Sequence, residues 1–462
     1  MSQKSTARAA VVDALRVRFG DRLSTGQSQR EQHGHGESWH APALPDAVVM
    51  VESTEEVAEV VSLCARHRVP VIPFGAGTSL EGHLQAIEGG ISIDLSSMRA
   101  VLAVNADDFD CRVQAGISHR ELNDYLHDTG LFFPVDPGAG ASIGGMTATR
   151  ASGTNAVRYG TMRENVMSLT YVDAHGNIVN TGSRAKKSSA GYDLTHLLVG
   201  SEGTLGVITE VGLRLHGLPE AIRSAVVDFP SVDEAVRTVI ETIQMGLPMA
   251  RIELVDHQYM AAINDYSKLD YPVRDTLFLE FHGTEQSVEE QVALFGDIAA
   301  EHGAGEMLSA KFEEDRQRLW RARHDAYFAI TARYPGKLAM TTDACVPISK
   351  LGEIVSYVRE AMQDSRFEPA VIGHVGDGNF HMIFCIDPEN ADELAEAQRC
   401  NAMLVEKTLE LGGTCTGEHG VGLGKLKYLR REHGDAAVDT MRVIKRALDP
   451  HDIMNPGKTV AI

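Results

Sequence analysis

Positive charge is scarce in this chain: its 462 residues include 43 Lys and Arg against 64 Asp and Glu, which gives a formal net charge of −21 at pH 7. Nucleic acids and anionic membrane surfaces repel such a protein, so neither is expected as a partner. Long apolar runs are also missing, because no stretch reaches the roughly 18 apolar residues that indicate a transmembrane helix. The acidity describes the whole surface and does not argue against a small anionic ligand in a pocket.

Cysteine is also scarce, at 6 residues, and the marks of a secreted protein are missing. The chain has no CxxC pair, and residues 1–20, which predict an amphipathic helix, show neither the apolar segment nor the cleavage site of a signal peptide. Asp13 and Asp21 interrupt the basic face that a mitochondrial transit peptide needs. We therefore expect a cytoplasmic protein, with peripheral membrane attachment left open and a mitochondrial location disfavoured. The cysteines should be reduced and mostly buried; they are Cys64, Cys111, Cys345, Cys385, Cys400 and Cys415.

Glycine, in contrast, is abundant, at 43 residues or roughly 9% against a usual ~7%. It clusters at 75–82, 138–160 and 200–206. The first cluster follows a strand–helix–strand pattern, and its backbone N–H groups could approach an anion. It is neither a P-loop nor a GxGxxG dinucleotide fingerprint, because it has no GK[ST] and position 80 is Leu. Taken alone, this cluster is explained equally well by a tight turn.

The chain changes character at about residue 219, where Gly217-Leu218-Pro219 marks a boundary. Before it, a small-residue loop over 134–160 is far longer than an ordinary connection of about 4–6 residues, which indicates a functional segment. Beyond it, helical patterns alternate with strand patterns. This texture predicts an α+β domain in which helices cover an antiparallel sheet.

Two histidines flank a predicted hairpin turn at Asp377-Gly378. Folding about this dipeptide would place His374 directly opposite His381, with Cβ atoms about 4.5–5.5 Å apart. That spacing suits two ligands of one metal ion and is favoured over two unrelated, half-buried histidines. Glu418 is the best candidate for a third ligand, although its Gly-Glu-His-Gly context is equally typical of a capping loop.

Together, the three glycine segments resemble the flavoproteins of the vanillyl-alcohol oxidase type, which have a PCMH-type FAD domain. The stretch 200–209 is similar to the third FAD segment of that family, and the resemblance covers 42–462. It implies an α+β fold: an N-terminal helix and lead-in over 1–41, a two-subdomain PCMH-type FAD domain over 42–219, and an antiparallel-sheet, ferredoxin-like substrate domain with C-terminal helices over 220–462. The tail from about 410, including an Asn-Pro-Gly-Lys turn, is expected to pack back on the FAD domain.

The resemblance also implies which residues bind FAD. Non-covalent binding is expected, because the first loop holds Thr78 and Ser79 where some members have a linked histidine; whether His83 has a role in attachment stays open. The implied FAD-binding residues are Pro73, Gly75, Ala76, Gly77, Thr78, Ser79, Gly82, Pro137, Gly138, Ala141, Ser142, Gly144, Gly145, Ser152, Gly153, Tyr159, Gly160, Glu202, Gly203, Gly206, Ile208 and Asn455.

The HxGDGNxH pattern at 374–381 and the GEHG pattern at 417–420 are similar to those of the D-2-hydroxy-acid dehydrogenases, and of the FAD-dependent D-lactate dehydrogenases in particular. The resemblance implies one divalent metal, Zn or Mn, on His374, His381 and Glu418, with His419 as the general base. It also implies substrate-binding roles for Arg323, Tyr327, Lys337 and Asn379. Without it, the segment around Arg323 reads as an ordinary charged helix.

The expected activity is the oxidation of D-lactate to pyruvate, with hydride transfer to flavin and electrons passed to a quinone, a cytochrome or an electron-transfer flavoprotein rather than to oxygen. D-2-hydroxyglutarate or glycolate are alternative substrates. An enzyme resembling alkyl-glycerone-phosphate synthase and a flavin-binding scaffold subunit are alternatives of other classes. A homodimer is left open, because the sequence does not reveal the oligomeric state.

Overall fold

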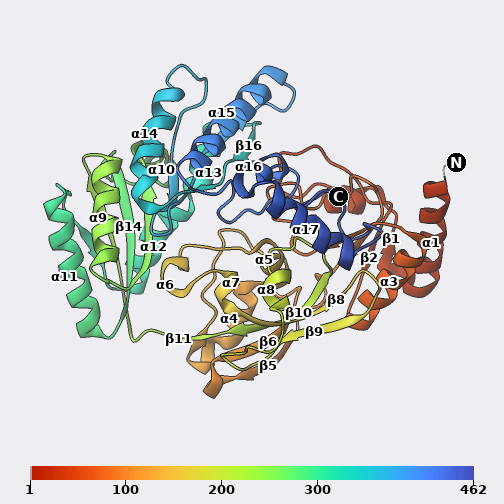
Figure 1. The fold of residues 1–462 in the computed structure, drawn as a ribbon. Helices are drawn as coiled ribbons and strands as arrows, with labels where there is room; N and C mark the ends of the chain where they lie inside the picture. Colours follow the sequence, from red (N-terminus) through yellow and green to blue (C-terminus); the bar gives the residue numbers. More distant parts are fainter. Residues whose placement is uncertain (1–2) are drawn as a thin grey trace. The chain divides into compact units, whose positions relative to one another are not determined.

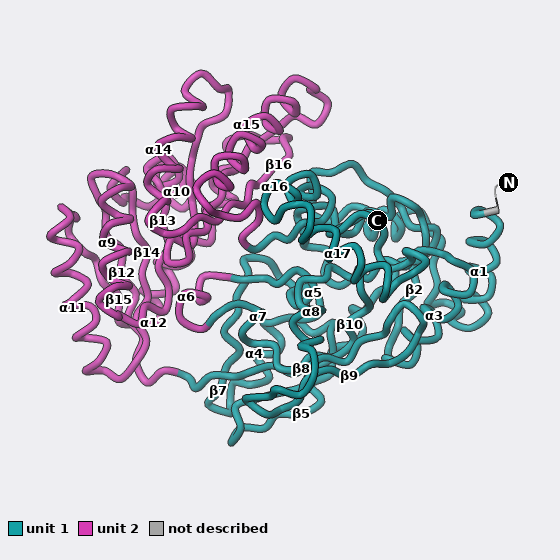
Figure 2. Tube along the Cα trace, in the orientation of Figure 1, with its two compact units in different colours: residues 1–152, 160–218, 418–462 teal, residues 153–159, 219–417 magenta. Residues whose placement is uncertain are grey.

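The computed structural model describes residues 3–462 (Figure 1), and Met1 and Ser2 of the expected N-terminal helix lie outside this range. The chain divides into two compact units (Figure 2). Unit 1 combines residues 1–152, 160–218 and 418–462, and unit 2 combines 153–159 with 219–417. Each unit therefore contains segments that are far apart in the sequence. Within residues 3–462, no helix is both long and apolar enough to span a membrane.

Unit 1 begins with a four-stranded sheet of order β1-β2-β4-β3, in which β2, β4 and β3 run parallel. The helix α3 (Thr54–His67) forms because Ser53 caps its first turn and Val57, Val60 and Cys64 lie on one buried face. The helix α1 (Gln3–Phe19) adds Val11 and further apolar side chains to the same core. The strands are β1 (Leu23–Ser24), β2 (Ala47–Met50), β3 (Val71–Phe74) and β4 (Ile91–Asp94), and a short helix α2 (Gln27–His33) lies between β1 and β2.

A five-stranded antiparallel sheet of order β5-β6-β10-β8-β9 forms the second part of unit 1. Its strands are β5 (Val101–Asn105), β6 (Asp110–Gln114), β8 (Val166–Val172), β9 (Ile178–Gly182) and β10 (Val207–Arg214), and β7 (Leu131–Phe132) pairs separately with β11 (His216–Gly217). The helices here are α4 (His119–Leu126), α5 (Ile143–Thr149), α7 (Met162–Asn165) and α8 (Leu194–Leu198); the C-terminal segment adds α16 (Leu429–His433) and α17 (Asp435–Leu448).

The small-residue segment 134–160 differs from the predicted loop, because it contains α5 and, in unit 2, α6 (Ala156–Tyr159). The Ser142 side chain accepts a hydrogen bond from Gly145 N and caps α5, while Ile143 and Met146 anchor the helix in the core. Glycine disfavours helices, so its abundance hid this one from sequence patterns.

Unit 2 is built on a seven-stranded antiparallel sheet of order β15-β12-β14-β13-β18-β19-β17, with β16 and β20 paired separately. Phe278 and Phe281 of β14 are three residues apart and therefore point to opposite faces. Phe278 packs against Trp320 of α12 and Phe281 against Phe295 of α11, so helices cover both faces. The strands are β12 (Ala221–Phe229), β13 (Met249–Val255), β14 (Asp275–Gly283), β15 (Leu308–Ala310), β16 (Leu338–Thr341), β17 (Ala344–Cys345), β18 (Ile372–His374), β19 (Asn379–His381) and β20 (Ile383–Ile386).

The helices of unit 2 differ from the predicted pattern in two places: the sequence does not predict the helix over His257–Ser267, and one predicted helix is broken. They are α9 (Val232–Gln244), α10 (His257–Ser267), α11 (Glu285–Glu301), α12 (Glu313–His324), α13 (Ala326–Ala332), α14 (Leu351–Ala361) and α15 (Ala391–Glu410). The sequence predicts one helix over 313–331, but the chain forms α12 and α13, which meet at Asp325. Buried apolar residues of both helices, including Trp320 and Ile330, face a common core.

Candidate functional site

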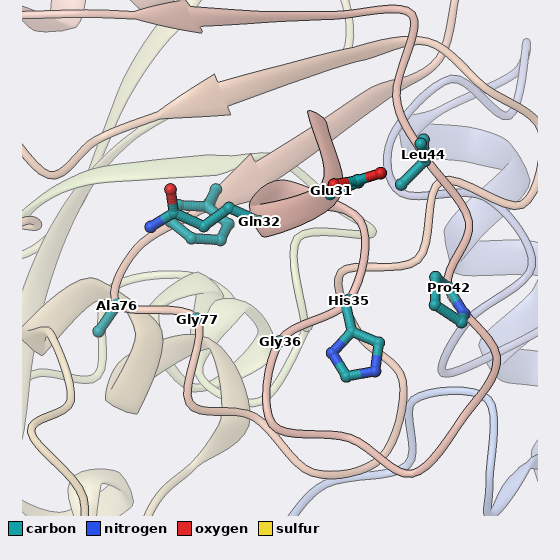
Figure 3. A pocket seen from close by; sticks show the side chains of 9 residues that line it. Glu31, Gln32, His35, Gly36, Pro42, Leu44, Ala76 and Gly77 are labelled. Atoms are coloured by element: carbon teal, nitrogen blue, oxygen red, sulfur yellow. The ribbon is translucent and has the colours of Figure 1, made fainter. Parts of the chain in front are cut away.

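The first glycine loop borders a cavity of about 840 Å³ in unit 1 (Figure 3). The loop leaves the carboxyl end of β3, an edge at which α/β sheets commonly receive ligands. The other wall of the cavity comes from α2 and the segment after it, which the sequence analysis did not predict. The lining residues are Glu31, Gln32, His35, Gly36, Pro42, Leu44, Phe74, Ala76 and Gly77. Gly36 belongs to this wall and approaches the first loop closely, because a Cβ there would lie 2.9 Å from Gly77 O.

The glycines of this region fit an extended cofactor. Gly77 adopts φ +77°, a conformation that favours glycine. Gly138 and Gly140 differ from closely packed glycines, because a Cβ at either position would meet no protein atom within 4 Å. Both glycines are exposed, so internal packing does not require glycine at these two positions. The chemistry of the loop, which is rich in backbone N–H donors and poor in side chains, suits the pyrophosphate of FAD.

The third glycine segment is held to the C-terminal tail inside unit 1. Glu202 has φ +54° and accepts hydrogen bonds from Val421 N at 2.6 Å, Gly422 N at 2.8 Å and Thr459 Oγ1 at 2.7 Å. Asn455 Nδ2 donates to Glu202 O at 2.8 Å. The side chains of Glu202 and Asn455, both expected at FAD, thus bind protein atoms.

Other residues of the flavin prediction are spread between the units. Tyr159 lies in unit 2, where its hydroxyl is 2.8 Å from His282 Nδ1. Gly203 packs in unit 1 against Pro73, and a Cβ at Gly203 would lie 2.9 Å from the ring of that proline. His83 is buried, and its Nε2 lies 3.2 Å from Glu202 Oε2. The assignment of individual FAD contacts remains a prediction.

The histidine hairpin forms, but its register differs from the prediction. His374 pairs with Asn379, and Ile372 pairs with His381, so the two histidines are diagonal neighbours on one face rather than directly opposite. Their ring centroids are 5.6 Å apart. A type I′ turn needs two positive φ angles, whereas of the dipeptide only Gly378 has one, at +76°. The turn is therefore longer, with Asp377 N donating to His374 O at 3.0 Å.

Protein oxygens fix the orientation of both imidazoles. His374 Nδ1 lies 2.8 Å from Glu253 Oε1, and His381 Nδ1 lies 3.0 Å from Thr342 O. Each contact engages Nδ1, which presents Nε2 as the nitrogen for a metal ion. Burial by itself would raise the pKa of Glu253, but His374 and Arg323 outweigh it and lower that pKa below its usual value.

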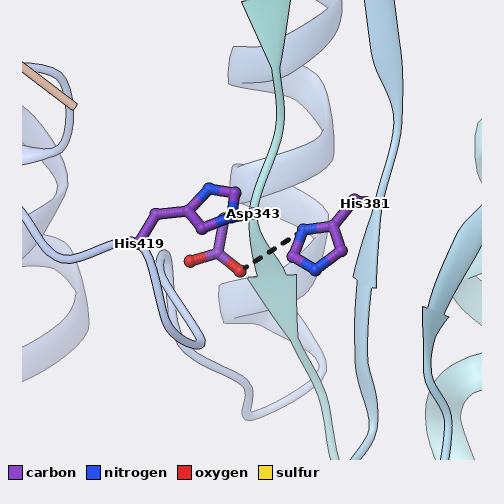
Figure 4. A group of neighbouring side chains, drawn as sticks. All are labelled: Asp343, His381 and His419. Atoms are coloured by element: carbon purple, nitrogen blue, oxygen red, sulfur yellow. Dashed lines mark ion pairs between the residues drawn. The ribbon is translucent and has the colours of Figure 1, made fainter. Parts of the chain in front are cut away.

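Two groups of side chains have ligand atoms close enough for one metal ion. The atoms of His374, His381 and Glu418 lie within 4.8 Å of one another, as do those of Asp343, His381 and His419 (Figure 4). Glu418 directly follows Gly417, the last residue of unit 2. The first group matches the expected His₂-carboxylate set, a donor set that suits Zn²⁺ or Mn²⁺ and leaves coordination positions open.

The expected substrate residues are not all brought together. Arg323 lies in the last turn of α12 and donates from Nη2 to Glu253 Oε2 at 2.6 Å. Tyr327 lies on α13, beyond the break at Asp325, and is 46% exposed. The two residues therefore do not share one continuous helix face. Lys337 Nζ contacts both carboxylate oxygens of Glu393, at 2.9 and 2.8 Å.

Asn379 is the fourth expected substrate residue, and it lies on β19 beside the histidines. Its Nδ2 donates to Asp343 Oδ1 at 2.8 Å, while its Oδ1 is buried without a hydrogen-bond partner among residues 3–462. Arg323 Nε is also buried and lacks such a partner in the described part of the chain. Buried polar atoms without partners are costly, so these two atoms are candidates for contacts with a ligand.

Sequence reasoning missed two carboxylates at this site. Glu253, on β13, is 1% exposed, and Asp343, just before β17, is fully buried and lies 3.8 Å from His381 Nδ1 (Figure 4). A single acidic residue inside an apolar strand pattern, Arg-Ile-Glu-Leu-Val, was the available indication for Glu253. Burying a carboxylate is unfavourable unless it is paired, so such a residue predicts a buried partner.

Two sequence-family models match the chain. The "FAD binding domain" matches residues 45–182, and "FAD linked oxidases, C-terminal domain" matches residues 218–459. The chain belongs to the FAD-linked oxidases. The predicted α+β architecture of an FAD domain followed by a substrate domain is confirmed for this oxidase, as is its resemblance to flavoproteins of the PCMH type.

Three relatives align with nearly the whole length of this FAD-linked oxidase. It is 48% identical to "Probable D-lactate dehydrogenase, mitochondrial" of Danio rerio, over 100% of this chain and 94% of that protein. It is 46% identical to "D-lactate dehydrogenase [cytochrome], mitochondrial" of Arabidopsis thaliana, over 97% and 80%. The "Glycolate oxidase subunit GlcD" of Bacillus subtilis is more distant, at 34% identity over 91% and 90%.

Solved structures agree on the fold. An alkyldihydroxyacetonephosphate synthase superimposes with a TM-score of 0.75 over 97% of this oxidase and 85% of that chain, at 22% identity. A p-cresol methylhydroxylase with substrate bound gives a TM-score of 0.76 over 99% and 97%, at 15% identity. At such low identities, the likeness shows a shared fold and not a shared reaction.

The cytoplasmic location expected from the sequence is wrong. The relatives from Danio rerio and Arabidopsis thaliana, and also those from Kluyveromyces lactis and Saccharomyces cerevisiae, are all named as mitochondrial. The physical reason is that a targeting address is read from a short segment by a receptor, so the composition and charge of the folded chain carry little information about it.

Proposed function

We propose that this FAD-linked oxidase is a D-lactate dehydrogenase, which oxidises D-lactate to pyruvate and passes the electrons to an acceptor other than oxygen. The observation that carries the proposal is 48% identity to a probable D-lactate dehydrogenase over the whole chain. The two neighbouring histidines on one face of β18 and β19 support it. They suit a metal ion, and such an ion could bind the hydroxyl and carboxylate oxygens of a 2-hydroxy acid.

The glycine segments of unit 1 would hold the flavin. Ala76 and Gly77 of the loop after β3 line the cavity of about 840 Å³, and a Cβ at Gly138 or Gly140 would meet no protein atom within 4 Å. Bound FAD would supply the oxidising chemistry, as the acceptor of the hydride that leaves C2 of the substrate. No histidine stands within the first loop itself, which favours non-covalent binding.

Three residues of the proposed site would hold a divalent cation, Zn²⁺ or Mn²⁺: His374, His381 and Glu418. Such a cation lowers the pKa of a bound hydroxyl, which makes its proton easier to remove. Glu253 and Thr342 hold the two imidazoles so that Nε2 faces the ligand. Asp343 is a further carboxylate within reach of His381, and it orients Asn379 through a hydrogen bond of 2.8 Å.

His419 is the proposed general base. It follows Glu418 in the chain and belongs to a group with Asp343 and His381 whose ligand atoms lie within 4.8 Å (Figure 4). An imidazole is suited to accept the hydroxyl proton near neutral pH. Arg323 would bind the substrate carboxylate through its buried Nε, and Asn379 Oδ1 would accept a hydrogen bond from the substrate. Loss of the hydroxyl proton and of the C2 hydride leaves a 2-keto acid.

The same geometry bears on the substrate alternatives. A distal carboxylate, as in D-2-hydroxyglutarate, needs a second cation, but Lys337 is bound by both oxygens of Glu393. Lys337 is therefore already paired and is a poor candidate for that cation. Glycolate is the second candidate, because the chain is 34% identical to a glycolate oxidase subunit.

A substrate panel with a dye acceptor tests the proposal. Purified protein should be yellow and should reduce dichlorophenolindophenol with D-lactate at least about tenfold better, in kcat/KM, than with L-lactate, glycolate or D-2-hydroxyglutarate. Dialysis against a chelator should remove most of this activity, and added Mn²⁺ or Zn²⁺ should restore it. A colourless protein would contradict the flavin assignment, and unchanged activity after chelation would contradict the metal assignment.

A further inference from the structure

One carboxylate in unit 2 contacts both a proposed metal ligand and the proposed substrate anchor. Glu253 lies on β13, between β14 and β18 of the seven-stranded sheet, and is 1% exposed. Its Oε1 is 2.8 Å from His374 Nδ1, and its Oε2 accepts a hydrogen bond of 2.6 Å from Arg323 Nη2. Glu253 thus contacts His374 with one carboxylate oxygen and Arg323 with the other, although these two residues are 51 positions apart in the sequence.

We infer that Glu253 is a positioning residue, which orients His374 toward the metal and Arg323 toward the substrate carboxylate. The inference rests on the proposed function and assigns Glu253 a part in it. Glu253 itself would touch neither metal nor substrate. It acts through the two side chains that it holds.

The effect on His374 follows from imidazole chemistry. A carboxylate at Nδ1 accepts a hydrogen bond from Nδ1–H, so the lone pair lies at Nε2, where a metal ion would bind. Such a partner also makes the ligand nitrogen more basic and stops rotation of the ring. Removing comparable partners of metal-bound histidines typically weakens metal binding by about 10–100-fold.

The effect on Arg323 follows from its donor atoms. Glu253 engages Nη2, while Nε is buried without a hydrogen-bond partner among the described residues. The guanidinium is planar, so fixing one of its nitrogens fixes the direction of the others. Held in this way, Arg323 keeps a buried donor for a ligand carboxylate. If Glu253 were absent, the guanidinium would be free to rotate and its buried charge would lose its partner.

A second buried glutamate in the same sheet provides a matched control. Glu280, on β14, is 6% exposed; its Oε1 lies 2.9 Å from His282 Nε2 and 3.5 Å from Arg251 Nε, and its Oε2 accepts a hydrogen bond from Ser224. Glu280 therefore pairs with one histidine and one arginine, as Glu253 does. The difference is that neither partner of Glu280 belongs to the proposed metal or substrate groups.

The experiment compares Glu253→Gln and Glu280→Gln in the flavin-loaded, full-length protein. The Kd for Mn²⁺ is measured on metal-stripped protein by competition with a chelator, together with KM and kcat for D-lactate and the melting temperature. We expect Glu253→Gln to raise the Kd by about tenfold or more and to raise KM, with Glu280→Gln leaving the Kd within about twofold. Both variants should lower the melting temperature to a similar extent, because both disturb a buried carboxylate.

Equal Mn²⁺ affinities of Glu253→Gln and wild type, or equal losses in the two glutamine variants, would overturn the inference. If Glu253→Gln does not fold, Glu253→Asp replaces it; aspartate keeps the charge but is one methylene too short to hold both partners, and Glu280→Asp is its control. An unchanged Kd and KM in Glu253→Asp would likewise overturn the inference. Wild-type protein that binds Mn²⁺ but oxidises no 2-hydroxy acid would contradict the proposed function, and the Kd comparison would still decide the role of Glu253.

Discussion

Two buried lysines of unit 1 show how neighbouring atoms decide the behaviour of a residue. Lys445 Nζ lies 2.5 Å from Asp449 Oδ2, so its charge has a partner. Lys458 Nζ donates instead to Gln85 O at 2.6 Å and Asn455 Oδ1 at 2.7 Å, which are both uncharged acceptors. Burial lowers the pKa of Lys458 to about 7, against a smaller opposing effect of Glu202. The same residue type thus pairs with a carboxylate at one position and has a strongly lowered pKa at the other.

This difference predicts a pH-dependent stability. The side chain of Lys458 has a pKa of about 10.4 in the unfolded chain and of about 7 in the folded chain. Between these values the unfolded chain binds more protons, so the free energy of unfolding rises with pH. Methionine has no such proton. The free energy of unfolding of Lys458→Met, measured relative to wild type by urea denaturation, should therefore fall by an amount on the order of 4 kcal/mol between pH 6 and pH 10.

The control for this experiment is Lys445→Met, which leaves the carboxylate of Asp449 fully buried and without its cation. This variant should be less stable than wild type at both pH values. A stability difference between Lys458→Met and wild type that does not change with pH would show that Lys458 stays charged in the folded protein.

At the scale of elements, the loop 418–424 depends on two glutamates of unit 1. Glu202 accepts hydrogen bonds from Val421 N and Gly422 N, and Glu81 O accepts one from Leu423 N at 2.7 Å. A Cβ at Gly420 would lie 2.7 Å from Glu202 Oε1, so the backbone approaches this carboxylate closely. The loop that carries the proposed base is therefore shaped by contacts behind it as well as by its own sequence.

Removal of Glu202 should loosen this loop. In Glu202→Ala, the amides of Val421 and Gly422 lose a buried, charged acceptor, and each such hydrogen bond contributes about 1.5–3 kcal/mol. We expect hydrogen–deuterium exchange of a peptide covering 418–424 to become at least about tenfold faster. Glu210→Ala, which removes a carboxylate of the five-stranded sheet paired with Arg112, should leave this peptide unchanged. Equal protection in Glu202→Ala and wild type would show that other contacts hold the loop.

The hairpin of β18 and β19 shows how far sequence patterns reach at this scale. Asp377-Gly378 correctly predicted two strands and a turn, and the alternation of residues put both histidines on one face. The predicted register was wrong, because the register also depends on the space around the turn. A Cβ at Gly378 would collide with the carbonyl oxygen of Val346, which lies 32 positions earlier in the sequence. Likewise, the pattern of 313–331 predicted helix but not the break at Asp325 that separates Arg323 from Tyr327.

Considered as a whole, the molecule draws its two proposed binding groups largely from different units. The residues that line the cavity proposed for flavin belong to unit 1, whereas His374, His381, Glu253 and Arg323 belong to unit 2; Glu418 and His419 are the members of the proposed metal and base group that belong to unit 1. Each unit has a hydrophobic core of its own, around β3 and α3 in unit 1 and around Tyr259 and Trp320 in unit 2. A change confined to one set of side chains should therefore leave binding by the other set intact.

Reciprocal variants test this independence. His374→Ala removes a proposed ligand and should lower the bound metal, measured by elemental analysis, well below one equivalent, while flavin absorbance per chain stays at the wild-type value. Gly77→Val should do the opposite, because φ is +77° and a Cβ there would lie 3.1 Å from the ring of Phe74. Loss of flavin in His374→Ala would show that the two groups do not bind independently.

The sequence by itself determined the class of protein, the order of its segments and most of the residue types at the proposed site. Glycine clusters, a hairpin dipeptide and histidine spacing are local features, and local backbone preferences suffice to interpret them. Only the tertiary structure decided which atoms those residues meet. Glu253 and Asp343 became visible as partners of His374 and His381, Lys337 proved to be bound by Glu393, and Glu202 proved to hold the C-terminal tail. The physical reason is that a buried charge must find its partner in space, and the sheet order that brings β13 beside β18 is set by the packing of the whole unit.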